Sequence, residues 1–141
     1  MMGYGPNRQG LPASFSSNGQ RIFLTGTSQS GNPITSRIGY MQMANGATSC
    51  ADCHLQDGRG GSWRTAMGSF KVPNITYPVL TSKQEHEDGG RKHPPYTEAT
   101  IKRAITQGVD PAGQPLQSPM PRWSMSNKDL TDLVEYLKNL R

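Results

Sequence analysis

The clearest periodic pattern in the chain lies in residues 126–141. Apolar side chains recur there at helical spacing between polar ones, at Leu130, Leu133, Val134, Leu137 and Leu140. Ser126 precedes this run and Asp129 follows three residues later, which resembles a capping box with Asp in place of Glu or Gln. The pattern predicts an amphipathic helix with one buried face.

A second helix is predicted over residues 97–108. Thr97 is a good N-cap residue, Gly108 is a typical helix stop, and the intervening apolar residues share one face, at Ile101, Ala104 and Ile105. Between this segment and the last helix, residues 109–123 contain four prolines. We therefore expect an irregular strap there.

The N-terminal part of the chain divides near residue 16. Residues 1–15 lack a hydrophobic period and predict a flexible segment, so the folded domain is expected to cover residues 16–141. Its first element is a short helix that starts at Ser17 or Asn18 and closes at Gly26. So short a helix needs tertiary packing to be stable.

Two long stretches show no helical period. Residues 27–48 and 58–95 are rich in Gly, Ser, Thr and Asn, and both are predicted to be loops. Loops of this length are uncommon in compact domains unless they are functional, so we expect both to enclose a bound group.

The amino-acid composition indicates what kind of group these loops enclose. Only 33% of the 141 residues are hydrophobic, and the chain has 16 glycines and 11 prolines. A thin polypeptide core is therefore expected, and a large apolar cofactor would supply the missing buried area.

The net charge of +5 comes from scattered basic residues, which do not resemble a nucleic-acid footprint. A net positive charge favours binding to acidic protein surfaces or to anionic lipid headgroups. No apolar stretch is long enough for a membrane span. The first ten residues also lack the apolar centre of a signal peptide, so we expect a mature or recombinant chain.

Both cysteines lie in the sequence CADCH at residues 50–54, the attachment signature of c-type haem. In a helical turn over residues 49–55, Cys50 and Cys53 share one face and can form thioethers with the two vinyl groups of the porphyrin. His54 is then placed to be the proximal iron ligand.

Three other uses of the cysteines carry less weight. A redox dithiol is expected in a βαβ context, which is missing here. A disulfide between them would close only a very small loop. A zinc site needs four ligands, and the spacing of the cysteines and histidines shows no paired finger pattern.

The second axial position decides between electron transfer and ligand chemistry. Met120 is the preferred candidate, because the prolines on both sides, Pro119 and Pro121, stiffen the backbone around it. Met125 lies next to the cap of the last helix and can pack as a core residue instead. A distal histidine or an open site is the remaining alternative, although both other histidines, His86 and His93, lie in polar surroundings that favour surface exposure.

The order of these motifs carries a family resemblance. CADCH, MPRW and LTDLVEYLKNL are together similar to class I (mitochondrial-type) bacterial monohaem cytochromes c over residues 16–141, and PNIT and ITQGVDPAGQPL resemble cytochrome subunits of periplasmic dehydrogenases. The resemblance implies an all-α fold with few helices and long loops wrapped around one covalently attached haem c. It also implies Met120 as the distal ligand, but the stretch 27–48 is longer than the family's usual connection.

The resemblance also implies two tertiary contacts. GQRIF resembles the family's first helix, in which Gly19 and Phe23 pack against the last helix at Leu133 and Tyr136. The carbonyl of Pro73 is the candidate acceptor for the N–H of the proximal imidazole. Buried haem propionates need donors, and the candidates are Trp63, Arg64, Tyr77, Arg122 and Trp123.

These features predict a monomeric electron carrier and not an enzyme. The expected location is the periplasm of a Gram-negative bacterium, and the expected partners are redox proteins with acidic docking surfaces, such as multihaem cytochromes or dehydrogenases. Contact with a membrane surface is compatible with the charge. The alternative is a haem-based sensor, ligand binder or peroxidase-type protein with a displaceable distal ligand.

Overall fold

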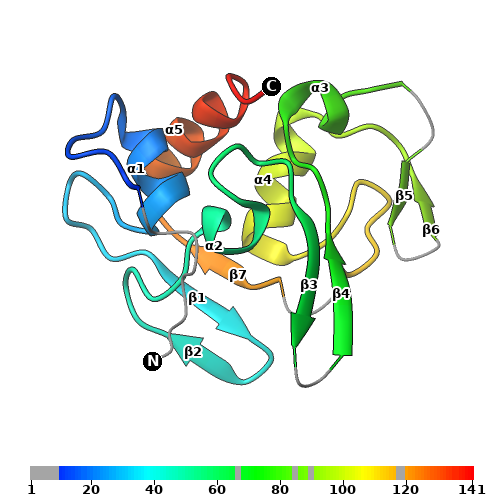
Figure 1. The fold of residues 1–141 in the computed structure, drawn as a ribbon, viewed down its shortest axis with the longest axis horizontal. Helices are drawn as coiled ribbons and strands as arrows, with labels where there is room; N and C mark the ends of the chain where they lie inside the picture. The colour runs from blue at the N-terminus through cyan, green and yellow to red at the C-terminus, as the bar shows by residue number, and fades with distance from the viewer. Residues whose placement is uncertain (1–9, 66–67, 84–85, 89–90, 117–119) are drawn as a thin grey trace.

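The computed structural model describes residues 10–65, 68–83, 86–88, 91–116 and 120–141. In Figure 1 the helices lie in the upper part of the molecule and two hairpins project below them. The helices are α1 (Asn18–Thr25), α2 (Cys50–His54), α3 (Tyr77–Leu80), α4 (Glu98–Gln107) and α5 (Asn127–Leu137). The strands are β1 (Thr35–Ile38), β2 (Met41–Met43), β3 (Gly61–Thr65), β4 (Gly68–Val72), β5 (His86–Asp88), β6 (Arg91–His93) and β7 (Arg122–Ser124).

The first and last helices pack against each other, as predicted (Figure 1). Gly19 is buried at the crossing, and a β-carbon at this position would lie 2.8 Å from Cβ of Tyr136. The rings of Phe23 and Tyr136 lie 5.4 Å apart, and Phe23 and Leu133 are both fully buried in the core. The absence of a side chain at Gly19 therefore sets how closely the two helices approach.

The predicted starts of α1, α4 and α5 and the predicted ends of α1 and α4 are confirmed, but α5 ends at Leu137 and not at residue 141, and its N-cap differs in one respect. Ser17 and Thr97 are the N-caps of α1 and α4, and Gly26 and Gly108 end these helices in the left-handed conformation. Ser126 caps α5 by accepting a hydrogen bond from the backbone of Asp129.

The difference is that the carboxylate of Asp129 does not complete a capping box at Ser126. Its Oδ1 instead accepts hydrogen bonds from Asn18 Nδ2 at 2.9 Å and Ser28 Oγ at 2.8 Å. Asp129 therefore ties α5 to α1 and to the start of the stretch 27–48.

The expectation of an all-α fold is wrong in one respect, because the described residues also form strands. β1 and β2 lie within the predicted loop 27–48, and β1 pairs with β7 from the strap to give the sheet order β2-β1-β7. The predicted loop 58–95 contains two further hairpins, β3–β4 and β5–β6, together with α3. Short antiparallel hairpins satisfy the backbone of a long connection locally, and strands of three to five residues leave little alternation for the sequence to show.

The core is built mainly by α1, α4 and α5. Its buried apolar residues include Ile22, Phe23, Leu24, Ile101, Ile105, Leu133, Val134 and Leu137. Leu11 and Phe15, from the predicted N-terminal segment 1–15, are partly buried against it, whereas residues 1–9 lie outside the described residues. Among the described residues no helix is both long and apolar enough to cross a membrane.

Candidate functional site

The two cysteines and His54 lie on the short helix α2, in the turn that the sequence predicted. Ser49 caps it reciprocally, because its Oγ accepts from the backbone N–H of Asp52 while the Asp52 carboxylate accepts from the backbone of Ser49 at 2.9 Å. The helix ends at Leu55, the one non-glycine residue with positive φ in the described part of the chain. A residue held in this sparsely populated region is typical of a functional segment.

The His54 ring is held in one orientation. Its side chain is buried, and Nδ1 lies 2.8 Å from the carbonyl oxygen of Pro73. A carbonyl can only accept, so Nδ1 carries the proton and Nε2 is left as the nitrogen with a lone pair. Burial lowers the pKa of His54, although the bond to Pro73 opposes this change. The imidazole is therefore neutral at pH 7 and suited to bind a metal.

A glycine lets the Pro73 carbonyl approach α2. Gly60 has φ of +68°, and a β-carbon there would lie 2.9 Å from the carbonyl carbon of Pro73. The backbone N–H of Gly60 donates to the His54 carbonyl at 2.9 Å. The loop after the CADCH motif therefore folds back onto His54 and brings Pro73 beside its ring.

Cys50, His54 and Met120 line one cavity of about 320 Å³. The rest of its wall is largely apolar and comes from α3, α4, α5 and β7: Val79, Leu80, Ile101, Ala104, Ile105, Leu137 and Trp123. Cys53 is half-buried on the same helix but is not part of this wall. Segments that are 66 residues apart in the sequence thus place an imidazole and a thioether at one apolar cavity.

Met120 is followed directly by Pro121 and then by strand β7. Pro121 is buried, and β7 pairs with β1 so that Trp123 faces Ser36, both of them buried. Pro119, on which the sequence argument partly rested, lies outside the described residues. Met125 is partly buried against the core and does not line the cavity.

The thiols are unsuited to chemistry that needs a thiolate. Burial raises the pKa of Cys50 to about 12 and also raises the pKa of Cys53. Both are then protonated at neutral pH, whereas redox dithiols use thiolates. Among the described residues no group of three or more His, Cys, Asp or Glu side chains is placed to hold a metal ion.

The donor set and the cavity together fit a haem. A neutral imidazole and a thioether are the axial ligands of electron-transfer haems, and an apolar wall accommodates the porphyrin. Cys50 in that wall, with Cys53 beside it on α2, provides sulfur atoms for thioethers.

His93 was expected at the surface but is half-buried and lines the cavity. Its ring contacts that of Tyr96 edge-on, with centroids 5.4 Å apart, and its Nδ1 lies 2.8 Å from the carbonyl oxygen of Pro94. The polar residues around His93 in the sequence did not predict this position. The position of His93 in the cavity wall depends on contacts with residues that are distant in the sequence. The side chain of His86 lies outside the described part.

Among the described side chains, only one of the candidate propionate partners lines the cavity. Trp123 lines the cavity and Tyr77 packs partly buried against the core. Arg122 does not line this cavity but borders a smaller hollow beside Met120. The side chains of Trp63 and Arg64 lie outside the described residues.

Comparison with known families gives one match. The sequence pattern of the Cytochrome c family matches residues 17–141, which includes every described helix and strand. The same sequence gives no match among curated proteins or among solved structures.

Proposed function

Because the chain belongs to the cytochrome c family, whose members bind haem c covalently, we propose that it is a one-electron carrier with a single haem in the cavity between α2 and Met120. Cys50 and Cys53 would hold the haem through thioethers, and His54 and Met120 would be the protein ligands of its iron. When bound, the haem supplies an iron that gains or loses one electron.

The observation that carries this proposal is the convergence of His54, Cys50 and Met120 on one apolar cavity. The Pro73 carbonyl fixes the His54 ring and increases its basicity as a ligand. The apolar residues of α4 and α5 exclude water from the site, which lowers the local dielectric and favours a defined reduction potential.

Two protein ligands to the iron, His54 and Met120, would leave it no coordination position for a substrate. This is why we propose a carrier and not an enzyme or ligand sensor. The protein's part is to fix the orientation, the dielectric and the approach of partners. We place the carrier in the periplasm, where redox proteins with acidic surfaces are its partners, because c-type attachment needs an oxidising compartment and the chain is basic.

The proposal is tested by absorption spectra and redox titration of the purified holoprotein. We expect a methionine-sulfur charge-transfer band in the near infrared and a reversible one-electron transition. Met120→Ala should abolish the band, lower the potential and open the iron to imidazole or cyanide. Met125→Ala is the matched control, because Met125 packs on the core outside the cavity, and it should leave all three properties nearly intact.

The reverse pattern would transfer the ligand role to Met125. A band that is absent from the unmutated protein would contradict methionine ligation and point to a histidine. His93 would then be the first residue to replace, because it lines the cavity.

A further inference from the structure

The stretch 27–48 builds a polar sheet face on the outside of the molecule. In the sheet β2-β1-β7, Arg37 lies between its Cα partners Gln42 and Arg122. Directly opposed residues in antiparallel strands point to the same side, so Arg37, Arg122 and Gln42 share one face. All three are exposed, whereas Ser36 and Trp123 on the other face are buried. We call the residues Thr35, Arg37, Gln42, Arg122 and Ser124 the arginine face.

The arginine face concentrates positive charge without compensation. Arg37 and Arg122 are directly opposed, an arrangement that destabilises a strand pair. Within the described part of the chain, neither guanidinium forms a hydrogen bond or ion pair. The hollows on both sides of the pair contain no carboxylate in their walls. The neighbouring side chains are amide and hydroxyl groups that can also donate hydrogen bonds to an anion.

The arginine face lies beside the proposed haem ligand. Arg37 and Arg122 border a hollow of about 180 Å³ whose wall also includes Met120 and Leu116. Met120 and Leu116 line the main cavity as well. A molecule bound at the arginine face is therefore separated from that cavity by the thickness of these two side chains.

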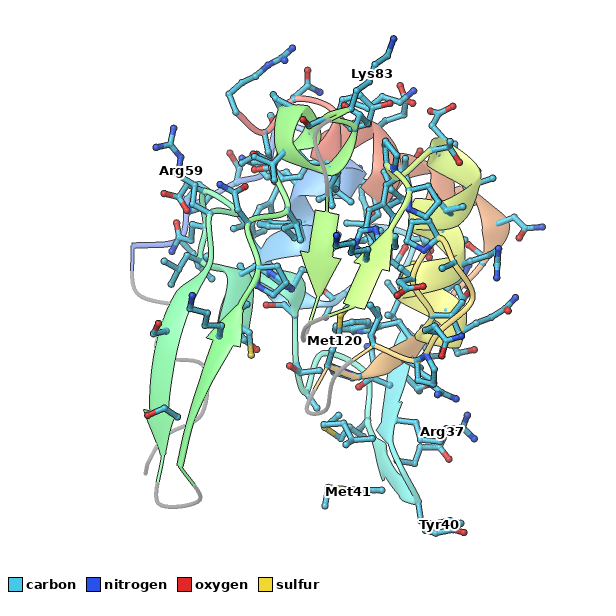
Figure 2. The ribbon with its side chains drawn as sticks, turned by 90° about the vertical axis from the view of Figure 1, so that its right-hand side faces the viewer. Arg37, Tyr40, Met41, Arg59, Lys83 and Met120 are labelled. Atoms are coloured by element: carbon cyan, nitrogen blue, oxygen red, sulfur yellow. The ribbon has the colours of Figure 1, made fainter. Side chains whose placement is uncertain are left out.

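Exposed apolar residues lie at the tip of the β1–β2 hairpin, beside the arginine face, although Met41 pairs with Ile38 and therefore points to the opposite side of the sheet from Arg37. Tyr40 is fully exposed and Met41 is 65% exposed, and Val79 is the only other large apolar residue of comparable exposure in the described chain. Figure 2 shows Tyr40, Met41 and Arg37 together at the lower end of the molecule, below Met120. Tyr, Met and Arg are the residue types enriched at protein interfaces.

We infer that the arginine face and the hairpin tip at Tyr40 form the docking surface for an acidic redox protein. Carboxylates of the partner pair with Arg37 and Arg122, and an apolar patch of the partner covers the tip. One electron then passes between the partner's redox centre and the haem, without transfer of atoms. This inference rests on the proposed function, and it gives the stretch 27–48 a role.

The test uses the holoprotein on gold surfaces coated with carboxylate-terminated or hydroxyl-terminated thiols. Adsorption is measured by surface plasmon resonance, and electron transfer is measured separately by voltammetry. The variants are Arg37→Gln and Arg122→Gln, with Lys83→Gln as the control that removes one exposed charge at the opposite end of the molecule (Figure 2). Unchanged circular dichroism and an unchanged methionine-sulfur charge-transfer band verify that each variant is intact.

On the carboxylate surface we expect each arginine variant to bind about 1.5-fold to fivefold more weakly than Lys83→Gln, the range for an exposed ion pair. The rate of electron transfer measured by voltammetry should also be lower for each arginine variant than for Lys83→Gln. On the hydroxyl surface all variants should behave alike. On a surface of mixed carboxylate and methyl groups, Tyr40→Ser should weaken adsorption further.

Equal adsorption of the arginine variants and Lys83→Gln on carboxylate would overturn the inference. Two other results would also overturn it: a difference seen only with phosphatidylglycerol vesicles assigns the face to anionic lipid, and displacement by inorganic phosphate but not by chloride of equal ionic strength assigns it to a small anion. The proposed function fails separately, if adsorbed holoprotein gives no reversible current. The adsorption data would still decide the docking face.

Discussion

The helix crossing at Gly19 makes a prediction in which two effects have opposite signs. Replacing Gly by Ala inside a helix normally stabilises it by about 1 kcal/mol. At Gly19, however, the added carbon would lie 2.8 Å from Cβ of Tyr136 and closer still to the backbone of Asp132. These atoms cannot move by a change of rotamer. The two helices must therefore separate, and overpacking of this kind costs about 1–3 kcal/mol.

Separation would also disturb polar contacts at the same crossing. Asn18, the neighbour of Gly19, donates to Asp129 at 2.9 Å and to Asp132 at 2.8 Å. Hydrogen bonds to charged groups are worth about 1.5–3 kcal/mol. Partial loss of one of them, added to the clash and reduced by the helix gain, gives a net destabilisation of about 2 kcal/mol. For a chain of this size the midpoint of thermal unfolding should fall by roughly 6 °C.

The assay is thermal or denaturant unfolding of the holoprotein followed by circular dichroism. Ala99→Val is the control, because Ala99 is exposed on α4 and should change stability by less than about 0.7 kcal/mol. Gly19→Val should be worse than Gly19→Ala, since it adds two further carbons. If Gly19→Ala is instead more stable than the unmutated protein, helix propensity dominates and the close crossing is wrong.

Three further outcomes are expected. Replacing Cys50 and Cys53 together by Ala should let acid-organic solvent extract the haem, and haem staining after denaturing electrophoresis should then fail; a band that persists would place the attachment elsewhere. Gly60→Ala should push the Pro73 carbonyl away from His54, reduce the basicity of that ligand and raise the reduction potential, and a redox titration that shows no change would contradict this coupling. Ser126→Ala should cost about 1 kcal/mol as a lost N-cap, and an unchanged unfolding midpoint would show that the cap of α5 is not needed.

Local structure was predictable wherever it depends on neighbours in the sequence. The N-caps Ser17, Thr97 and Ser126 and the stops Gly26 and Gly108 lie where the sequence placed them, because a cap satisfies backbone groups within the same turn. The turn that carries Cys50, Cys53 and His54 was predictable for the same reason. Its role in haem attachment could also be predicted, because the C-x-x-C-H spacing is typical of that role.

The hairpins could not be predicted in this way. β1 and β7 are separated by more than eighty residues, and their pairing depends on a register that no local pattern encodes. The loops that contain the other hairpins are rich in polar residues, and their strands are only three to five residues long, so the sequence shows no alternation from which the pairing could be predicted.

The sequence by itself thus determined the attachment motif, the starts of the three longer helices, the glycine stops of α1 and α4, and the thin core that makes room for a cofactor. The Pro73 carbonyl at His54 was expected from the family resemblance. Only the tertiary structure decided which other groups meet at the cavity: His93 lies in its wall, and Trp123 lies inside while Arg122 lies outside. The physical reason is that capping and helical faces are fixed by interactions a few residues apart. The cavity wall and the arginine face arise from segments that approach only after the chain has folded.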